Sequence, residues 1–412
     1  MYDEEERGTG RESGLRCRQE RPATSPSPQI MAMIEPSERE NRWRNADPAM
    51  LVVTLLILGF GLLTIYSADN RDLSLSSVVF KQALFAVVGF VLMGLLAALD
   101  YRFLRVLSLP MYGAGLLLLA LVLKFGTIIG GAQRWFTFGP LSFQPSEPAK
   151  LATILLVAGF IAMRGTHIRG PFSFVASGIL AAVPAVLVFV EPDLGTALIF
   201  VAIWFGIIAV SRTRWIYLFG TLAAIVPAYW VAWYGILGRE PFFHQYQKDR
   251  LTCFWHVDAD TFGFCSNVVQ ARITIGQAGL SGHRFADAAI LNEQQGLAVS
   301  TSDFAFAHSI GNFGFIGALA LFILYLLLIW RYLRVAQLAR DEFGQLIAIG
   351  AATMLFFQSF VNIGMNVGIL PVVGIPLPFI SQGGTPLVTL LVTQGILQSI
   401  LMHRHSLAFG RK

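Results

Sequence analysis

The chain has 412 residues, of which 55% are hydrophobic and only 13% are charged. A soluble domain carries about 25% charged residues, and crossing the hydrocarbon of a bilayer takes roughly 20 apolar residues in a helix. Several apolar runs reach that length, so we expect a membrane protein. The formal charge of +5 comes with no basic helix or aromatic–basic groove, and nucleic-acid binding is therefore not expected.

Residues 1–47 are expected to form a disordered cytoplasmic tail, because Arg, Glu, Ser and Pro dominate and few side chains could be buried. No signal peptide is expected before the first long apolar run, which starts near Pro48. That run lacks a small-residue cleavage site at its end, so it is predicted to stay in the protein as a helix.

Ten apolar runs follow in chain order and predict an all-α polytopic membrane protein. The predicted spans are 49–67, 79–99, 106–124, 149–163, 172–190, 194–210, 214–236, 305–330, 345–368 and 383–402. They form a transmembrane domain at 48–405, with a large extracellular loop at 237–304 between spans seven and eight. Residues 406–412 form a short tail.

Arginine is concentrated in the connections on one side of these spans, and such connections face the cytoplasm. The dense set comprises Arg102, Arg105, Arg164, Arg169, Arg212, Arg214, Arg331, Arg334 and Arg340. This bias predicts a multi-pass protein of the cytoplasmic (inner) membrane with both termini inside. The segments 125–148, 191–193, 237–304 and 369–384 are then predicted to lie outside.

A polar stretch precedes the fourth span and contains GAQRW and FQPSEPAK. Prolines on either side of Ser146 suit a helix start that the serine could cap. Lys150 then lies in the first turn of an apolar helix, where a charge is costly unless it is paired or faces a wet cavity. Glu147, three residues earlier, is its natural partner. The two either form a structural pair or lie near an anionic substrate, for which Arg134 is another candidate.

Two shorter motifs fall in segments that are predicted to lie outside. In EPDLGT, Asp193 occupies a very short turn between two spans. A carboxylate at membrane depth is a functional candidate, and the alternative is an ordinary acidic turn. In QARITIG, a short helix or re-entrant segment is expected to break at glycines. Arg272 in this motif either meets phosphate or lies on the surface of a loop helix.

Asp303 opens the eighth span in SDFAFA. It could cap the helix, or it could act as a general base if it is a partly desolvated carboxylate that faces a cavity. A Pro- and Gly-rich run, 362–384, then links spans nine and ten, and such backbone is tolerated at membrane depth only where it is buried or lines a cavity. Gly383 and Gly384 are expected to offer free N–H groups to an anion, and Ser381 is a further binding candidate.

Three cysteines are present, and Cys17 lies in the N-terminal tail. Cys253 and Cys265 both lie in the predicted external loop, where an oxidising environment permits a disulfide. Two unpaired thiols are the alternative. No CxxC or His/Cys spacing indicates a structural zinc site.

The order and spacing of GAQRW, FQPSEPAK, EPDLGTA, QARITIG, SDFAFA and NIGMNVGILPVVGIPLPFISQGG resemble the RodA/FtsW/SpoVE (SEDS) family over about residues 48–405. The PVVGIPLPFIS sequence resembles RodA most closely within the family. The resemblance implies a peptidoglycan glycosyltransferase that polymerises lipid II into polyprenyl-linked glycan strands, for cell elongation or division. It also implies a class B penicillin-binding protein as partner.

The resemblance further implies that Asp303 is the essential acid, because it matches the Asp of the family's (T/S)DFIFA motif. Lys150 and Arg272 match a Lys and an Arg of two other family motifs. The sequence departs from the family pattern before Asp303, where AVSTS replaces the usual approach. It departs again at Gly311-Asn312, which replace an acidic pair, and at IGQAG and SQGGT.

Such a polymerase needs a base for the acceptor hydroxyl and positive charge for the departing pyrophosphate. Asp303 is predicted to be the base. The positive charge is predicted to come from Lys150, Arg272 and Arg134. A divalent cation, Mg²⁺ or Mn²⁺, could assist if Asp193 or Glu147 held it. Two other functions stay open: a lipid II flippase, which needs no external base, and a non-catalytic scaffold for a penicillin-binding protein.

Overall fold

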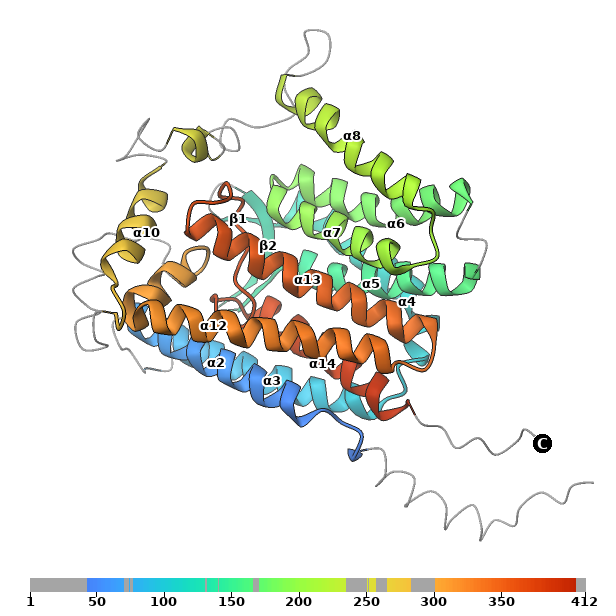
Figure 1. The fold of residues 1–412 in the computed structure, drawn as a ribbon, viewed down its shortest axis with the longest axis horizontal. Coiled ribbons are helices and arrows are strands. Elements are labelled where there is room, and N and C mark those ends of the chain that lie inside the picture. Colours follow the sequence, from blue (N-terminus) through green and yellow to red (C-terminus); the bar gives the residue numbers. More distant parts are fainter. Residues whose placement is uncertain are drawn as a thin grey trace, which may run out of the picture. The chain divides into compact units, whose positions relative to one another are not determined.

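Ten apolar helices of the computed structural model lie where the sequence predicts membrane spans (Figure 1). The structure describes residues 43–69, 74, 77–129, 132–139, 141–165, 170–234, 250, 252–256, 265–282 and 301–404. The helices are α2 (Pro48–Ala68), α3 (Val78–Ala98), α4 (Phe103–Phe125), α5 (Ser146–Arg164), α6 (Pro171–Val190), α7 (Leu194–Val210), α8 (Trp215–Tyr234), α12 (Ala305–Leu338), α13 (Glu342–Asn366) and α14 (Gly384–Met402). Among the described residues, eight helices are long and apolar enough to cross a membrane, and α7 and Trp215–Ala224 of α8 are shorter apolar helices. The predicted polytopic helical architecture is confirmed.

Most of the predicted loop at 237–304 lies outside the described residues, as do the predicted tails apart from residues 43–47. The described part of the loop contains α10 (Ser266–Gln277), which is the short helix predicted around Arg272. This helix packs on α12 and α13, where Val268 and Ala271 meet Phe304 and Met365. The end of the loop is therefore anchored to the helical core.

Four helices, α2, α3, α7 and α13, start with a capping side chain. Asp47 accepts hydrogen bonds from the backbone N–H groups of Ala49 and Met50 and so begins α2. The predicted cap at Ser146 is wrong. Pro145 occupies the cap position of α5 without a side-chain bond, and the Ser146 hydroxyl is buried with no hydrogen-bond partner among the described residues. The two prolines restrict the backbone sufficiently for the helix to start without that bond.

Some helices are enclosed by others, and some expose apolar surface. Helices α5, α13 and α14 are mostly buried, whereas α3, α4 and α6 expose large apolar side chains such as Val87, Leu117 and Val186. Helix α14 lies along α3 so closely that a Cβ on Gly395 would stand 2.5 Å from the carbonyl oxygen of Met93. Apolar side chains that face outwards along several helices suit contact with lipid.

The eighth predicted span differs from its prediction, because α12 is broken at Gly314 (φ 65°, ψ −165°). After the break, the N–H groups of Phe315 and Ile316 donate to the carbonyls of Gly279 and Leu280, at 3.0 and 3.1 Å. Residues 304–312 are all buried, whereas the next turn exposes large apolar side chains. The helix begins at Ala305, as predicted for span eight, and the part of α12 whose large apolar side chains face outwards begins near residue 315.

A small antiparallel sheet, which the sequence analysis did not predict, lies between α4 and α5. Its strands are β1 (Thr127–Ile129), β2 (Ala132–Phe138) and β3 (Leu141–Phe143), in the order β1-β2-β3. The Cα partners include Thr127 with Trp135 and Phe136 with Phe143. The sheet gives the polar segment before α5 a defined shape and fixes Arg134 on its central strand.

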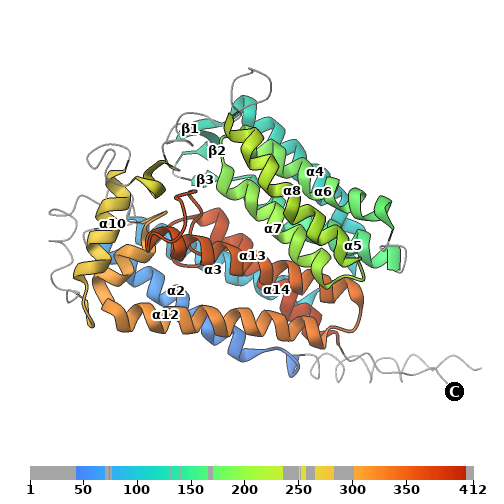
Figure 2. The same cartoon turned by 45° about the horizontal axis from the view of Figure 1, so that its top comes forward.

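The segments that are predicted to lie outside meet at one end of the helices, near α10 and the sheet (Figure 2). The Gln144 N–H donates to Thr385 Oγ1 (3.3 Å), which joins the sheet segment to the start of α14. The Gln382 N–H donates to the Thr301 carbonyl (2.7 Å), which joins the 367–383 connection to the end of the large loop. Their common location agrees with their being on one side of the membrane.

Candidate active site

The backbone on either side of Asp303 is held by side chains and backbone far away in the sequence. Three successive carbonyls accept hydrogen bonds from the segment 362–382. Gln382 N–H donates to the Thr301 carbonyl, and Ser381 Oγ donates to the Ser302 carbonyl at 2.6 Å. The Thr301 hydroxyl also donates to Gln382 Oε1 at 2.8 Å. The approach to Asp303 is thus fixed without use of its carboxylate.

Two asparagines of α13 complete this arrangement. Asn362 Nδ2 and Asn366 Nδ2 donate to the Asp303 carbonyl at 3.0 and 3.1 Å. Asn362 Nδ2 also donates to the Ile375 carbonyl at 2.7 Å, and Asn366 Oδ1 accepts the Ala307 N–H at 3.1 Å. Both asparagines are buried, so they join the Asp303 segment, the first turn of α12 and the 367–383 connection.

Asp303 is not the cap of α12, so that alternative is wrong. The helix begins at Ala305, Phe304 occupies the cap position, and no side chain there caps the helix. One N–H group of the first turn, that of Ala307, is satisfied by Asn366 from another helix. The cap prediction failed because the sequence could not show a partner 59 residues away.

The Asp303 carboxylate lies against the same glycine as the guanidinium of Arg250, a residue that the sequence did not mark. A Cβ built on Gly374 would lie 2.8 Å from Arg250 Nη1 and 3.5 Å from Asp303 Oδ2, so both groups face the same glycine. Asp303 is only partly exposed. Burial raises the pKa of Asp303 above its ordinary value, and the charges of Arg250 and Arg134 counteract that rise.

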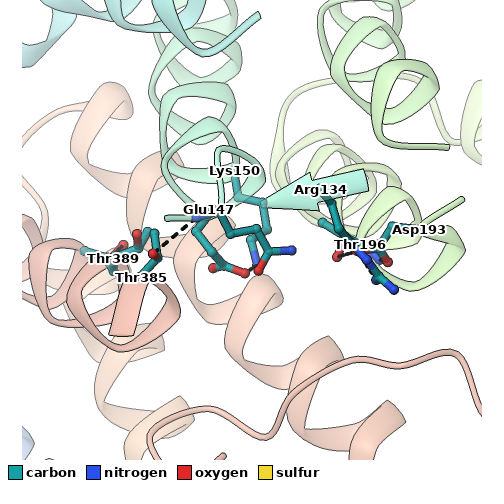
Figure 3. A network of polar contacts seen from close by, with 9 residues as sticks. Arg134, Glu147, Lys150, Asp193, Thr196, Thr385 and Thr389 are labelled. Carbon is teal, nitrogen blue, oxygen red and sulfur yellow. Dashed lines mark hydrogen bonds and ion pairs between the residues drawn. The ribbon is translucent and has the colours of Figure 1, made fainter. Parts of the chain in front are cut away.

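Arg134 and Asp193, whose charges both act on Asp303, form an ion pair (Figure 3). Arg134 Nη1 lies 2.9 Å from Asp193 Oδ2, and Asp193 is almost wholly buried. Asp193 also accepts hydrogen bonds from the N–H and the hydroxyl of Thr196, both at 3.0 Å, and so caps α7. An ordinary acidic turn therefore does not fully explain the EPDLGT motif, because Asp193 also holds the Arg134 guanidinium.

The predicted pair of Glu147 and Lys150 is confirmed, with Lys150 Nζ at 2.8 Å from Glu147 Oε1. The two side chains lie between the Arg134–Asp193 pair and two threonines of α14 (Figure 3). They are only 4% and 1% exposed. Such burial favours the structural alternative, in which the pair holds the start of α5 in place, over direct contact with a substrate.

Glu191 is a second residue that the sequence analysis passed over. It follows α6, is 1% exposed, and its Oε1 has no hydrogen-bond partner among the described residues. Burial and then the neighbouring charge of Asp193 raise the pKa of Glu191 to about 8, while Arg134 opposes the shift. Glu191 is therefore mainly protonated at neutral pH, and the Arg134–Asp193 pair has no second ionised acid beside it.

Arg272 lies in α10, with its guanidinium against the turn that follows α13. A Cβ on Gly368 (φ 81°) would stand 2.6 Å from Arg272 Nε. That Nε is buried without a hydrogen-bond partner in the described part of the chain. A cation at a helix C-terminus is favourable, so Arg272 has a structural role there in addition to the predicted one toward phosphate.

The residues before α14 hold the backbone in place, and one prediction about them is wrong. The Gly383 N–H was predicted to be free, yet it donates to Gln82 Oε1 at 3.1 Å. The Ser381 hydroxyl donates to the Ser302 carbonyl and accepts the Leu377 N–H at 2.8 Å. Gly384 packs so closely on α3 that a Cβ would lie 2.4 Å from the ring of Phe85. These contacts give all three binding candidates a structural explanation.

Cys253 and Cys265 form a disulfide, so the alternative of two free thiols is not what the structure contains. Both residues are buried. The departures at Gly311-Asn312 lie inside the buried first part of α12, where Ser67 Oγ donates to Asn312 Oδ1 at 3.2 Å. These departures therefore alter a buried contact and not the immediate surroundings of the Asp303 carboxylate.

The described residues contain no group of three or more His, Cys, Asp or Glu side chains that could hold a metal ion. Asp193 and Glu147 are each already paired with a cation. These residues do not form a metal site by themselves, and a divalent cation that entered with substrate phosphates stays a prediction.

Comparisons with known proteins identify the family of the chain. The model of the FtsW/RodA/SpoVE family, described as cell cycle protein, matches residues 48–406. The chain belongs to this family. It is 35% identical to the peptidoglycan glycosyltransferase MrdB of Escherichia coli (strain K12) over 366 residues, which are 88% of this chain and 95% of MrdB. It is 31% identical to stage V sporulation protein E of Bacillus subtilis (strain 168), over 86% of this chain and 96% of that protein.

Solved structures of family members have the same fold. RodA of Thermus thermophilus is 29% identical with a TM-score of 0.64, over 87% of this chain and 97% of RodA. A chain from a peptidoglycan synthase complex, solved to describe the coordination of polymerization and crosslinking, is also 29% identical and has a TM-score of 0.74. That comparison covers 87% of this chain and 98% of the other. The family and the multi-pass membrane fold that the sequence indicated are confirmed.

Proposed function

We propose that this protein is a peptidoglycan glycosyltransferase that joins lipid II units into glycan strands. The observation that carries the proposal is the state of Asp303. Its backbone carbonyl is held by Asn362 and Asn366, its side chain caps no helix, and Arg250 lies beside it. A carboxylate that is fixed in place and free of a capping role is suited to proton transfer. The names of the relatives support the same activity.

In the proposed reaction, the 4-hydroxyl of the acceptor sugar attacks the anomeric carbon of the donor. A new carbon–oxygen bond forms, the bond to the polyprenyl pyrophosphate breaks, and the hydroxyl proton passes to Asp303. Burial raises the pKa of Asp303, which makes the carboxylate a better base, and the charges of Arg250 and Arg134 oppose that rise and favour the ionised form. The same two arginines are placed to receive the negative charge of the leaving pyrophosphate.

We further propose that this site faces the outside of the cytoplasmic membrane and that both termini are inside. The arginine-rich connections support this orientation. The disulfide at Cys253–Cys265 supports it independently, because disulfides persist in oxidising compartments. Lipid II would then meet the site at the outer surface, with its polyprenyl tail among the apolar helices.

We propose a class B penicillin-binding protein as partner. The similarity to a chain of a peptidoglycan synthase complex that combines polymerization and crosslinking supports this partner. Newly polymerised strands would then be close to the enzyme that cross-links them.

The test uses the purified full-length protein with lipid II, alone and with the penicillin-binding protein from the same organism. The product is measured as glycan strand length on a gel. Strands made by the wild type and absent with Asp303→Asn are expected. A wild type that makes no strands with its partner present, yet moves lipid II between leaflets of vesicles, would replace the polymerase with the flippase. A protein with neither activity that still binds the partner would be a scaffold.

A further inference from the structure

Arg250 reaches Asp303 from a short segment whose described residues are 250 and 252–256. In this segment the His256 N–H donates to the Thr252 carbonyl at 2.8 Å, which closes one helical turn. Cys253 stands three residues after Arg250, so the two lie about one turn apart. The position of Cys253 therefore largely decides where the Arg250 guanidinium can reach.

The disulfide partner of Cys253 is Cys265, which belongs to the start of helix α10. It occupies the cap position of α10, and its carbonyl accepts the N–H groups of Val268 and Val269 at 3.0 and 3.1 Å. Helix α10 is anchored in turn by Val268 and Ala271 in an apolar cluster with Phe304, the residue that follows Asp303. Contacts thus lead from the core to Cys265, the disulfide continues them to Cys253, and Arg250 lies three positions earlier in the chain.

We propose that the Cys253–Cys265 disulfide is a positioning device that keeps Arg250 at Asp303, so that breaking it lowers the rate of glycosyl transfer. This inference rests on the proposed function. Both cysteines are 0–1% exposed, which suits a permanent structural link better than a bond that is exchanged. Neither cysteine touches the reacting atoms in this proposal, since each acts through Arg250.

The size of the effect follows from the chain that the bond closes. The cysteines are 12 positions apart in the sequence, and in the chain-entropy model closing a loop of this order restricts the chain by a factor of up to about 100. Without the bond, Arg250 would leave Asp303 for part of the time. The expected loss in kcat is therefore at most about 100-fold, with a smaller change in KM.

A change in pH dependence accompanies the loss of rate. The charges that act on Asp303 in the described residues are those of Arg250, of Arg134 on β2 and of Asp193 before α7. Arg272 on α10 lies against Gly368 instead. Because Arg250 lowers the pKa of Asp303, its departure raises that pKa. The acid limb of the pH–rate profile should therefore move to higher pH.

The experiment compares four variants of the full-length protein with the wild type in the lipid II assay. They are Cys253→Ala/Cys265→Ala, which leaves no lone thiol, Arg250→Gln, the combination of all three substitutions, and Cys17→Ala as the matched control. The double-alanine and Arg250→Gln variants should both lose rate and shift the acid limb upwards. Their effects should not add in the combined variant, because both act through the same guanidinium. Cys17→Ala should behave as wild type.

Reduction of the wild type, with both free thiols confirmed by mass spectrometry before the rate is measured, gives a second test that needs no substitution. Dithiothreitol supplies two electrons and two protons, so that it becomes oxidised while Cys253 and Cys265 become thiols. Rate should fall on reduction and return on reoxidation, whereas thermal unfolding shows that the protein stays folded. Wild-type rate and pH profile in the fully reduced protein, or additive effects in the combined variant, would overturn the proposal. A wild type with its bond intact and no activity would instead count against the proposed function.

Discussion

Asp303→Asn removes one negative charge from the candidate site and leaves the shape of the side chain almost unchanged. Because the Asp303 carbonyl, and not its carboxylate, accepts the bonds from Asn362 and Asn366, those bonds should persist. Asp303 caps no helix, so Asp303→Ala should fold as well as the Asn variant does. Both substitutions therefore test chemistry and not architecture.

The expected loss of polymerisation rate is 10²–10⁴-fold, the usual contribution of a general base. It corresponds to about 3–6 kcal/mol of transition-state free energy, at about 1.4 kcal/mol for each tenfold change. Stability should move in the other direction. Burial raises the pKa of Asp303, so ionised Asp303 weakens the folded state once the pH exceeds the ordinary pKa of an aspartate. The neutral amide avoids this loss, and the thermal midpoint at pH 7 should stay unchanged or rise.

The assay measures glycan strands from lipid II at equal amounts of folded protein, with thermal unfolding followed in the same detergent. Asp100→Asn is the matched control, since Asp100 is exposed and accepts the Arg102 N–H at 3.0 Å, which an amide oxygen can also do. Its rate should equal that of the wild type. Wild-type strand formation by Asp303→Asn would refute the base assignment, and loss of rate together with a lower midpoint would show that Asp303 supports the fold.

Three further predictions concern the surrounding groups and the orientation. Lys150→Met alone should lower the free energy of unfolding by about 3–5 kcal/mol, because it leaves Glu147 buried without its cation. Adding Glu147→Gln should restore most of that stability, as measured by thermal unfolding. Equal stability of the single and the double variant would contradict a tight pair. Since the pKa of Glu191 is raised to about 8, the wild type should lose stability as the pH rises from about 4 towards 8. Glu191→Gln should lack this loss, and parallel curves for the two proteins would show that Glu191 is not buried. With Cys17 removed, Leu280→Cys should react with an impermeant thiol reagent in intact cells, because residue 280 is proposed to lie outside. Phe103→Cys should react only after permeabilisation, because residue 103 is proposed to lie inside. The reverse pattern would contradict the proposed orientation.

The spans could be predicted because hydropathy and arginine bias are local properties of the sequence. The Glu147–Lys150 pair was accessible for the same reason, since three residues separate its members. Arg250 was missed because nothing near it in the sequence marks its approach to Gly374 and Asp303. The cap at Asp303 was predicted wrongly because Asn366, on another helix, satisfies the first turn of α12. Contacts between distant segments decide the site, and a single sequence does not contain them.

The break in α12 divides the helix into a part that spans the bilayer and a part that lies next to Asp303. Residues 315–338 provide about 36 Å of helix at 1.5 Å per residue, which exceeds the roughly 30 Å of hydrocarbon by itself. The preceding turns carry His308, Ser309 and Asn312, all buried in protein. Gly314 connects these turns to residues 315–338. Residues 315–338 would tilt more in a thinner membrane and less in a thicker one, while the Asp303 segment stays bonded to α13 and the 367–383 connection. The protein can therefore keep one active geometry in membranes of different lipid composition.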